Sequence, residues 1–381
     1  MDFDFSEEQV MLRDVARQFL ADKSTVEHAR KMFEDAVGYD KGIYRQMAEV
    51  GLLGLPFPES YGGAGLGMVE QAIVLEEMGR VAYPGPYTAS VVLAGTAILA
   101  SGDEGAMARY LPGIASGELT ATLAFLGDDI NWSPEGVTLR ATADGDGYVL
   151  NGTKRFVPFA HAVDTIVVVA RTGDGADAVS LLAVPRETAG LTIQKNETLD
   201  PNAKVSTLTF KDVRVPADAL IGAKDGAAAA VRTTMQRAAL GAAAEMLGAS
   251  RKALEMSVDY AKVREQFGQP IGSFQAIKHY LATMLEAVEN THSAVYYAAW
   301  AVEAGSLDAD LAVSSAKAYA NESARMVTGQ AIQVHGGIGY TWEYDLHLYW
   351  KRAKHLEPLY GDTAHHRERV LQEVIAGRVI E

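Results

Sequence analysis

The sequence predicts an α+β protein of several domains: an N-terminal α-helical domain, a middle antiparallel β domain of barrel-like form, and a C-terminal four-helix bundle. Near both ends of the chain the apolar residues recur at helical spacing, whereas in the middle they occur in short alternating runs. A length of 381 residues leaves room for two or three domains, at roughly 150 residues each. We place the boundaries at residues 1–118, 119–222 and 223–381.

The first domain is predicted to be helical because three of its segments carry apolar residues three and four positions apart. These segments are QVMLRDVARQFL, IYRQMAEVGLLG and QAIVLEEMGRVA. Stretches rich in Gly and Pro, LPFPESYGGAGLG and YPGPY, lie between or after them and predict turns.

The middle domain is predicted to be mostly antiparallel because turn residues separate its short apolar runs. VTLRATADGDGYVLNGTKRFV alternates on both sides of DGDG, which indicates a β-hairpin. The runs TIVVVARTG, VSLLAVP, LTIQKN and STLTFKDVRVP follow, and they are enriched in β-branched residues.

The last domain is predicted to be a bundle because four long helical patterns follow one another with short connections. The first runs for some 40 residues without proline, as AAAAVRTTMQRAALGAAAEMLGASRKALEMSVDYAKVREQF. The others are FQAIKHYLATMLEAVENTHSAVYYAAWAVEAG, ADLAVSSAKAYANESARMVTGQAIQVHGG and AHHRERVLQEVIAG.

Composition excludes several classes of function. A net charge of −15 disfavours both nucleic acid and an anionic membrane as partners. The absence of cysteine excludes disulfides, a thiolate nucleophile and cysteine-ligated metals. The chain shows neither a signal peptide at its start nor an apolar run of the ~18 residues that span a bilayer. We therefore expect a cytoplasmic protein.

Several strings, in order along nearly the whole chain, resemble the acyl-CoA dehydrogenase family. They are ESYGGAGLG followed by VLEEMGR, then YAKVREQFGQPIGSFQAIKH, then QVHGGIGYTWEYDLHLYWKRAK. The resemblance implies FAD as cofactor, an acyl-CoA thioester from fatty-acid or sterol side-chain metabolism as substrate, and α,β-desaturation. It also implies dimers paired into tetramers, with electron-transfer flavoprotein as the electron acceptor.

In this family one subunit holds the flavin ring, and its partner reaches over to the pyrophosphate and adenine end. The reaching-over residues that the resemblance implies here are Arg264, Gln266, Phe267, Gln275, Gln333, Gly336 and Gly337. Their types suit the task, because a guanidinium forms charge-assisted hydrogen bonds to phosphate and paired glycines let the backbone approach a ligand closely.

The residues that hold the ring in the family are not matched. Where members typically carry a Thr-Glu-Pro-x-x-Gly-Ser-Asp-like loop, residues 119–132 read LTATLAFLGDDINW. Where members carry Trp-Ile-Thr, this chain has Phe156, Val157 and Pro158, and proline brings neither a hydroxyl nor an N–H. Phe156 is still a candidate to stack on the ring. Either the loop has diverged in sequence and still binds the flavin ring, or it belongs to a cleft that no longer binds a flavin of its own.

The family's catalytic glutamate falls on Tyr360, and a phenol with an ordinary pKa near ~10 is a poor proton acceptor at neutral pH. Asp362 is a candidate substitute, although capping of the following helix is the favoured interpretation. The family's flavin-contacting Gly-Thr segment falls at Asp362 and Thr363, which makes Thr363 a further candidate for cofactor binding.

Other members of the family place the base on the first long bundle helix, where this chain has Ala238. Glu245 lies seven residues further along, almost two helical turns, and therefore on the same face. Burial in ALGAAAEMLGA would raise the pKa of a lone carboxylate toward that of a base. The alternative is a buried glutamate paired with an arginine such as Arg237 or Arg251.

No metal site is predicted. His365 and His366 are adjacent on a helix and so do not share a face, which favours a solvated helix start. His335 in QVHGG is expected to pack or cap near the adenine end of the flavin.

Two functional hypotheses follow from the resemblance. The first is a self-sufficient homotetramer in which Glu245 or Asp362 replaces the missing base. The second is a subunit of a heteromer with a paralogous chain, an assembly known among bacterial members of the family. The second is favoured because the losses all lie on the ring-holding side. A binding protein without flavin is disfavoured, because the residues for the adenine side persist.

Overall fold

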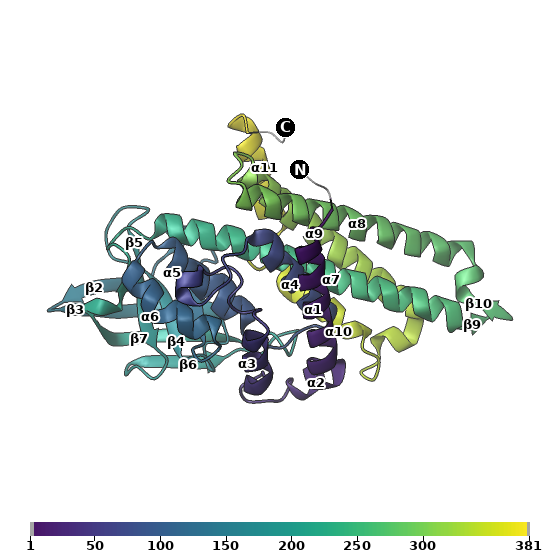
Figure 1. The fold of residues 1–381 in the computed structure, drawn as a ribbon, viewed down its shortest axis with the longest axis horizontal. Helices are drawn as coiled ribbons and strands as arrows, with labels where there is room; N and C mark the ends of the chain where they lie inside the picture. The colour runs from purple at the N-terminus through teal and green to yellow at the C-terminus, as the bar shows by residue number, and fades with distance from the viewer. Residues whose placement is uncertain (1–3, 379–381) are drawn as a thin grey trace. The chain divides into compact units, whose positions relative to one another are not determined.

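The computed structural model describes residues 4–378, which divide into two compact units (Figure 1). Of the described residues, the first unit contains those within Met1–Lys31, Gly67–Tyr83 and Ala239–Glu381. The second contains those within Met32–Leu66 and Pro84–Ala238. The three domain boundaries given above stay a prediction.

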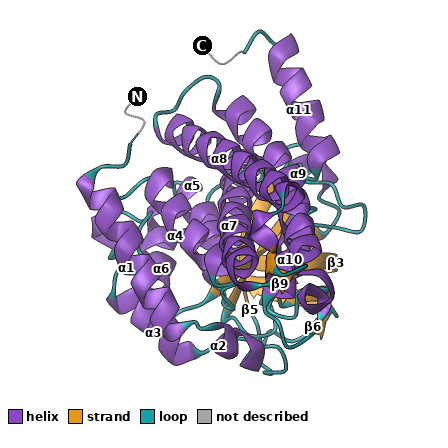
Figure 2. Ribbon diagram, turned by 90° about the vertical axis from the view of Figure 1, so that its right-hand side faces the viewer, coloured by secondary structure: helices purple, strands orange, loops and turns teal. Residues whose placement is uncertain are grey.

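The first unit is built almost entirely from helices. Its N-terminal helices are α1 (Glu7–Lys23), α2 (Val26–Lys31) and α4 (Met68–Arg80). Its C-terminal helices are α7 (Ala228–Val263, whose start belongs to the second unit), α8 (Gln275–Glu303), α9 (Ala309–His335), α10 (Leu346–Leu356) and α11 (Thr363–Ile375). Helices α8, α10 and α11 pack against α9, which therefore forms the centre of this group (Figure 2).

The C-terminal helices predicted from the sequence are confirmed, and the structure adds one more. The four predicted patterns correspond to α7, α8, α9 and α11. Helix α10 is not among the predicted helices, although Leu346, Tyr349, Ala353 and Leu356 recur at helical spacing and are all buried. This short helix carries an arginine that is central to the candidate site.

Helices α4 and α7 cross at two glycines that face each other's backbone. A Cβ atom at Gly79 would overlap the carbonyl of Glu245, and one at Gly248 would overlap the carbonyl of Glu76. The two helices therefore pack backbone to backbone, with no side chain between them at this point. The crossing fixes where α7 presents Glu245.

The second unit contains the sheet. Its helices are α3 (Lys41–Glu49), the π-helical turn η2 (Thr88–Gly95), α5 (Thr96–Ala100) and α6 (Glu104–Ala115). Its strands are β1 (Ala121–Ala124), β2 (Arg140–Asp144), β3 (Gly147–Pro158), β4 (Thr165–Arg171), β5 (Val179–Pro185), β6 (Leu191–Lys195), β7 (Val205–Pro216) and β8 (Leu220–Ile221). They form one sheet in the order β6-β7-β3-β2-β4-β5-β8, with β1 paired to β4.

The sheet confirms the predicted antiparallel β region. Strands β2 and β3 form the hairpin expected at DGDG, because Asp144 pairs with Gly147 across a two-residue turn. Only the contacts of β4 with β1 and β2 are parallel among the described strand pairs. Strand β3 is irregular near its end, where its pairing with β7 skips from Lys154 to Val157. Among the residues that the structure describes, none of the helices is long and apolar enough to cross a bilayer.

We expect Gly248→Ala to destabilise the protein by about 1–3 kcal/mol, because the added methyl group meets a carbonyl that can move only with its helix. Gly329→Ala in α9 is the matched control, because a Cβ atom there has open space around it. That control should be neutral, or stabilising by up to about 1 kcal/mol, through helix propensity. Urea denaturation measures both variants. Equal stability of the two would contradict the close crossing.

Candidate functional site

A buried ion pair occupies the part of the first unit where the base is expected. Arg352, from α10, binds the carboxylate of Glu245, from α7, and both side chains are at most 10% exposed. The same guanidinium donates hydrogen bonds to the carbonyl oxygens of Ala82 (3.3 Å) and Tyr83 (3.2 Å), just after α4. Arg352 thus joins three segments that are far apart in the sequence.

This pairing favours the second interpretation of Glu245 given above, a buried glutamate paired with an arginine. The partner is Arg352 and not Arg237 or Arg251. Arg251 instead binds Glu76 and Glu289, and Arg237 makes no ion pair among residues 4–378. A carboxylate with a bound guanidinium is stabilised in its ionised form and accepts a proton less readily than a lone buried one. The ion pair therefore argues against Glu245 as the base.

Tyr360 lies close to this ion pair, on a strained turn between α10 and α11. Its side chain is 8% exposed, and burial together with the Glu245 carboxylate raises the pKa of Tyr360 above its usual value. The residue has a φ of 59°, in the left-handed region that non-glycine residues rarely adopt. A neutral, buried phenol cannot accept the α-proton of a thioester at neutral pH, so Tyr360 is not suited to act as a base.

Asp362 caps α11, as the favoured interpretation of the sequence expects. Its Oδ1 accepts a hydrogen bond from the amide of His365 at 2.8 Å, and the residue is exposed. Thr363, the first residue of that helix, is partly buried. Catalysis by Asp362 and cofactor binding by Thr363 stay predictions.

His366 differs from the solvated helix start that the sequence predicts. It is 2% exposed, and its Nε2 lies 3.1 Å from the carbonyl oxygen of Tyr360. Burial, followed by the charge of Lys317, lowers the pKa of His366 to about 3, so the imidazole is neutral and donates from Nε2. The prediction failed because the chain folds back at Gly361 and covers this histidine.

The residues predicted to reach a partner's FAD gather around the end of α7. Arg264 follows α7 directly, and β9 (Glu265–Gln266) and β10 (Gln269–Pro270) then form a small hairpin (Figure 1). Arg264 is exposed, and its guanidinium has no ion-pair partner within the described part of the chain. Phe267, at the tip, is 93% exposed. A free cation next to an exposed ring is an arrangement that can receive a nucleotide phosphate.

The other predicted contact residues are also exposed. Gln275 begins α8, and Gln333 lies in the last turn of α9. Gly336 and Gly337 follow in a short 3-10 helix, η6 (Gly336–Tyr340), and a Cβ atom at either would meet nothing. His335 packs instead: its ring stacks on Tyr260 with centroids 4.4 Å apart. The residues of this end of the unit fit the tail of a dinucleotide.

At the positions that the sequence aligns with the family's ring-holding segments, in the second unit, neighbouring residues bind one another. The hydroxyl of Thr122 donates to the carbonyl of Pro158 at 2.7 Å, and the fully buried Lys154 donates to the carbonyl of Phe125 at 2.6 Å. Phe125 is buried, whereas Phe156 is 42% exposed and has a φ of 52°. The Thr122 hydroxyl and the Lys154 amino group thus donate to internal carbonyls, and Pro158 has no N–H, so these three residues do not fit a flavin ring as the family's residues do.

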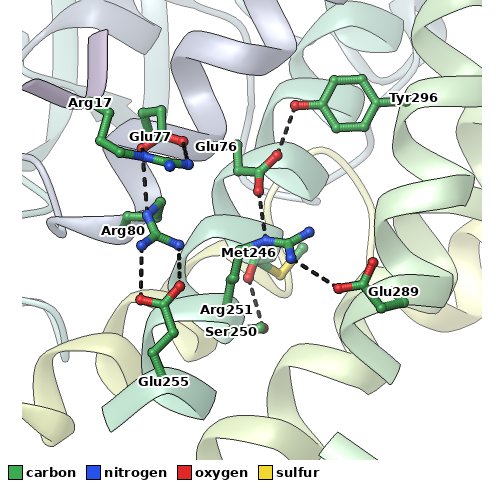
Figure 3. A network of polar contacts seen from close by, with 10 residues as sticks. All are labelled: Arg17, Glu76, Glu77, Arg80, Met246, Ser250, Arg251, Glu255, Glu289 and Tyr296. Carbon is green, nitrogen blue, oxygen red and sulfur yellow. Dashed lines mark hydrogen bonds and ion pairs between the residues drawn. The ribbon is translucent and has the colours of Figure 1, made fainter. Parts of the chain in front are cut away.

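A second polar site, which the sequence analysis missed, lies between α1, α4, α7 and α8 (Figure 3). Glu77 binds Arg17 at 2.7 Å, and Glu76 accepts hydrogen bonds from Arg251 at 3.0 Å and from the Tyr296 hydroxyl at 2.7 Å. The adjoining cavity of about 420 Å³ is lined by four arginines and four acidic residues. These charges balance, so we interpret the network as a structural link between helices.

This network could have been suspected from the sequence. Two adjacent glutamates, Glu76 and Glu77, stand within the apolar pattern of α4, and charged residues on a buried face need partners. Groups of His, Cys, Asp or Glu that could hold a metal ion do not occur in the described residues.

Comparison with known proteins supplies the wider context. Residues 6–118, 133–213 and 224–375 match the family models described as the N-terminal, middle and C-terminal domains of acyl-CoA dehydrogenase. The chain is 34% identical over 365 residues to the probable acyl-CoA dehydrogenase YngJ of Bacillus subtilis (strain 168), covering 94% of this chain and 95% of that protein.

Two further relatives belong to complexes by their names. The chain is 30% identical over 383 residues to the caffeyl-CoA reductase-Etf complex subunit CarC of Acetobacterium woodii, covering 99% of each protein. It also superposes on a chain of the ChsE4-ChsE5 complex from Mycobacterium tuberculosis with a TM-score of 0.89 and 28% identity. That match covers 98% of this chain and 99% of that one.

We expect Arg352→Met to destabilise the protein by about 3–5 kcal/mol, because the buried Glu245 carboxylate loses its counter-ion. The double variant Glu245→Leu with Arg352→Met should recover most of that loss, since it buries no charge at this place. Arg367→Met is the surface control, because Arg367 pairs with Glu322 in solvent and should contribute less than about 1 kcal/mol. Thermal denaturation of the three variants and the wild type measures these differences in stability. A double variant as unstable as Arg352→Met would refute the explanation.

Proposed function

This chain belongs to the acyl-CoA dehydrogenase family, and we propose that it works as one subunit of a heteromeric, FAD-dependent enzyme that desaturates the α,β bond of an acyl-CoA thioester. In this proposal, a paralogous subunit holds the flavin ring and supplies the base. This chain contributes residues to the pyrophosphate and adenine end of the partner's FAD. Electron-transfer flavoprotein is the proposed electron acceptor.

One observation carries the proposal: Tyr360, at the position where we propose the family's base falls, is a buried phenol, and the candidate carboxylate of Glu245 is bound by an arginine. Abstraction of a proton next to a thioester needs a positioned carboxylate in a dry site. Tyr360 is neutral there, and Glu245 is paired with Arg352. A complete reaction therefore needs a carboxylate from another chain.

The exposed residues after α7 and α9 supply the second part of the argument. FAD, when bound, accepts the hydride that leaves the β-carbon. Toward such a group this chain offers the free guanidinium of Arg264 and the unobstructed backbone of Gly336 and Gly337. Arginine pairs with phosphate through two parallel hydrogen bonds, and glycines allow a ligand to lie against the backbone.

The named relatives are consistent with a role inside a larger assembly. CarC is named as a subunit of a complex with Etf, and the ChsE4-ChsE5 structure is titled as a complex of two differently named chains. A self-sufficient homotetramer remains the competing proposal, and it would need Glu245 or Asp362 as its base. The ion pair of Glu245 and the capping role of Asp362 both weigh against it.

We expect the chain purified alone to be colourless and inactive, and to carry about one FAD per heterodimer when it is co-expressed with a paralogous partner. Flavin absorbance and turnover with an acyl-CoA measure this. A yellow, active homotetramer that loses its activity on Glu245→Gln would establish the competing proposal instead.

Within the heteromer, we expect Arg264→Ala to weaken FAD binding about 10- to 100-fold, because a charge-assisted hydrogen bond to phosphate contributes about 1.5–3 kcal/mol. Arg45→Ala is the matched control, because Arg45 is also exposed and lies on α3, outside the proposed contact region. Equilibrium dialysis of FAD compares the two variants. Equal affinities would remove Arg264 from the proposed contact.

A further inference from the structure

Lys317 is a buried lysine that the proposed reaction does not use. It lies on α9 and is 0% exposed. Its Nζ lies within hydrogen-bond distance of Asn321 Oδ1 (2.6 Å) and of the carbonyl oxygens of Leu356 (3.2 Å), Glu357 (3.0 Å) and Gly361 (3.2 Å), which share its N–H donors. Within the described residues Lys317 forms no ion pair. Backbone and amide oxygens surround its Nζ in place of the water molecules that would solvate an exposed lysine.

The carbonyl groups that Lys317 binds lie at the end of α10 and in the turn that follows it. Leu356 ends α10, and the last carbonyls of a helix lack partners within the helix and carry partial negative charge. Gly361 follows Tyr360 in the turn that leads to α11. One amino group therefore holds both the end of the helix that carries Arg352 and the turn that carries Tyr360.

The turn needs such support because its backbone is strained. Tyr360 has a φ of 59° and Gly361 a φ of 112°, and a Cβ atom at Gly361 would collide with His365. Strained conformations persist where the surrounding contacts over-determine them. Here two donors from two helices do so: Lys317 binds the carbonyl of Gly361, and His366 binds the carbonyl of Tyr360.

We propose that Lys317 is a positioning residue for position 360: its buried amino group, together with the imidazole of His366, holds residues 356–361 in the one conformation that sets the side chain of residue 360 beside Glu245. The inference rests on the proposed function only for the meaning of position 360 as the family's base position. The conformation itself is a property of the isolated chain.

The charge of Lys317 gives the turn a measurable signature. Burial lowers the pKa of Lys317 to about 7, while the nearby carboxylates of Glu357 and Asp362 act in the opposite direction. If the turn opens and Lys317 reaches water, its pKa returns toward the ordinary value near ~10.4. Opening therefore takes up a proton between these two values, and a rise in pH within that window makes opening less favourable.

The other titratable groups around the turn leave this window clear. Burial lowers the pKa values of His365 and His366, so both imidazoles are neutral above pH 7 in the closed turn, and an ordinary histidine is neutral there too. Burial raises the pKa of Tyr360, so its phenol is neutral in this range as well, and the acidic groups that face Lys317 are Glu357 and Asp362. Between about pH 7.5 and 9 the pH dependence reports on Lys317.

The experiment is hydrogen–deuterium exchange of the purified full-length chain, read in peptides that cover residues 356–362 and corrected for the intrinsic pH dependence of exchange. In the wild type, protection should rise about tenfold per pH unit between about pH 7.5 and 9, because one proton is taken up on opening. In Lys317→Met, protection should be at least about tenfold lower at pH 7.5 and should lose this rise.

Lys154→Met is the matched control, because Lys154 is the other fully buried lysine with a pKa lowered to about 7, but it binds a carbonyl in the second unit. It should leave the rise intact in residues 356–362. A wild-type turn without the rise overturns the proposal, even if Lys317→Met fails to fold, and so does a rise that survives Lys317→Met. No partner or FAD enters this measurement, so its result is independent of whether the heteromer is found.

Discussion

The ion pair between Arg352 and Glu245 is the constraint on which the interpretation of this chain depends. It joins α10 to α7 and, through the carbonyls of Ala82 and Tyr83, to the segment after α4. Burying two charges is expensive unless each is paired and hydrogen-bonded, and here the guanidinium meets both conditions. The pairing that holds these helices together also occupies the Glu245 carboxylate. It therefore argues against Glu245 as the base that abstracts a proton.

The residues compared with the family's FAD contacts are of two kinds. Some are exposed and can contact a ligand, and others already bind groups of this chain. Arg264, Gly336 and Gly337 are exposed and have room for a ligand. Thr122 and Lys154, in contrast, donate to carbonyl groups of their own unit. This difference is one of hydrogen bonding and not only of residue identity. It gives a physical basis to the idea of a subunit that completes its partner's cofactor site.

Periodicity predicted the fold class, because apolar spacing reflects local geometry that each segment carries in its own sequence. The site was harder to predict, because its partners are far apart in the chain. The arginine that binds Glu245 lies 107 positions away, on a helix that the sequence analysis did not identify. Lys317 reads as an ordinary lysine on a helix, and only the fold brings its amino group under the turn. His366 was expected in solvent because nothing local indicates that the chain folds over it.

The glycine crossing of α4 and α7 has a mechanical consequence. A side chain at a helix crossing can change rotamer to make room for a larger neighbour, but a backbone carbonyl can move only with its helix. Any residue larger than glycine at position 79 or 248 would therefore have to push α4 and α7 apart at their crossing. Because Glu245 lies on α7 and Ala82 and Tyr83 directly follow α4, such a separation would also part the two groups that Arg352 holds together.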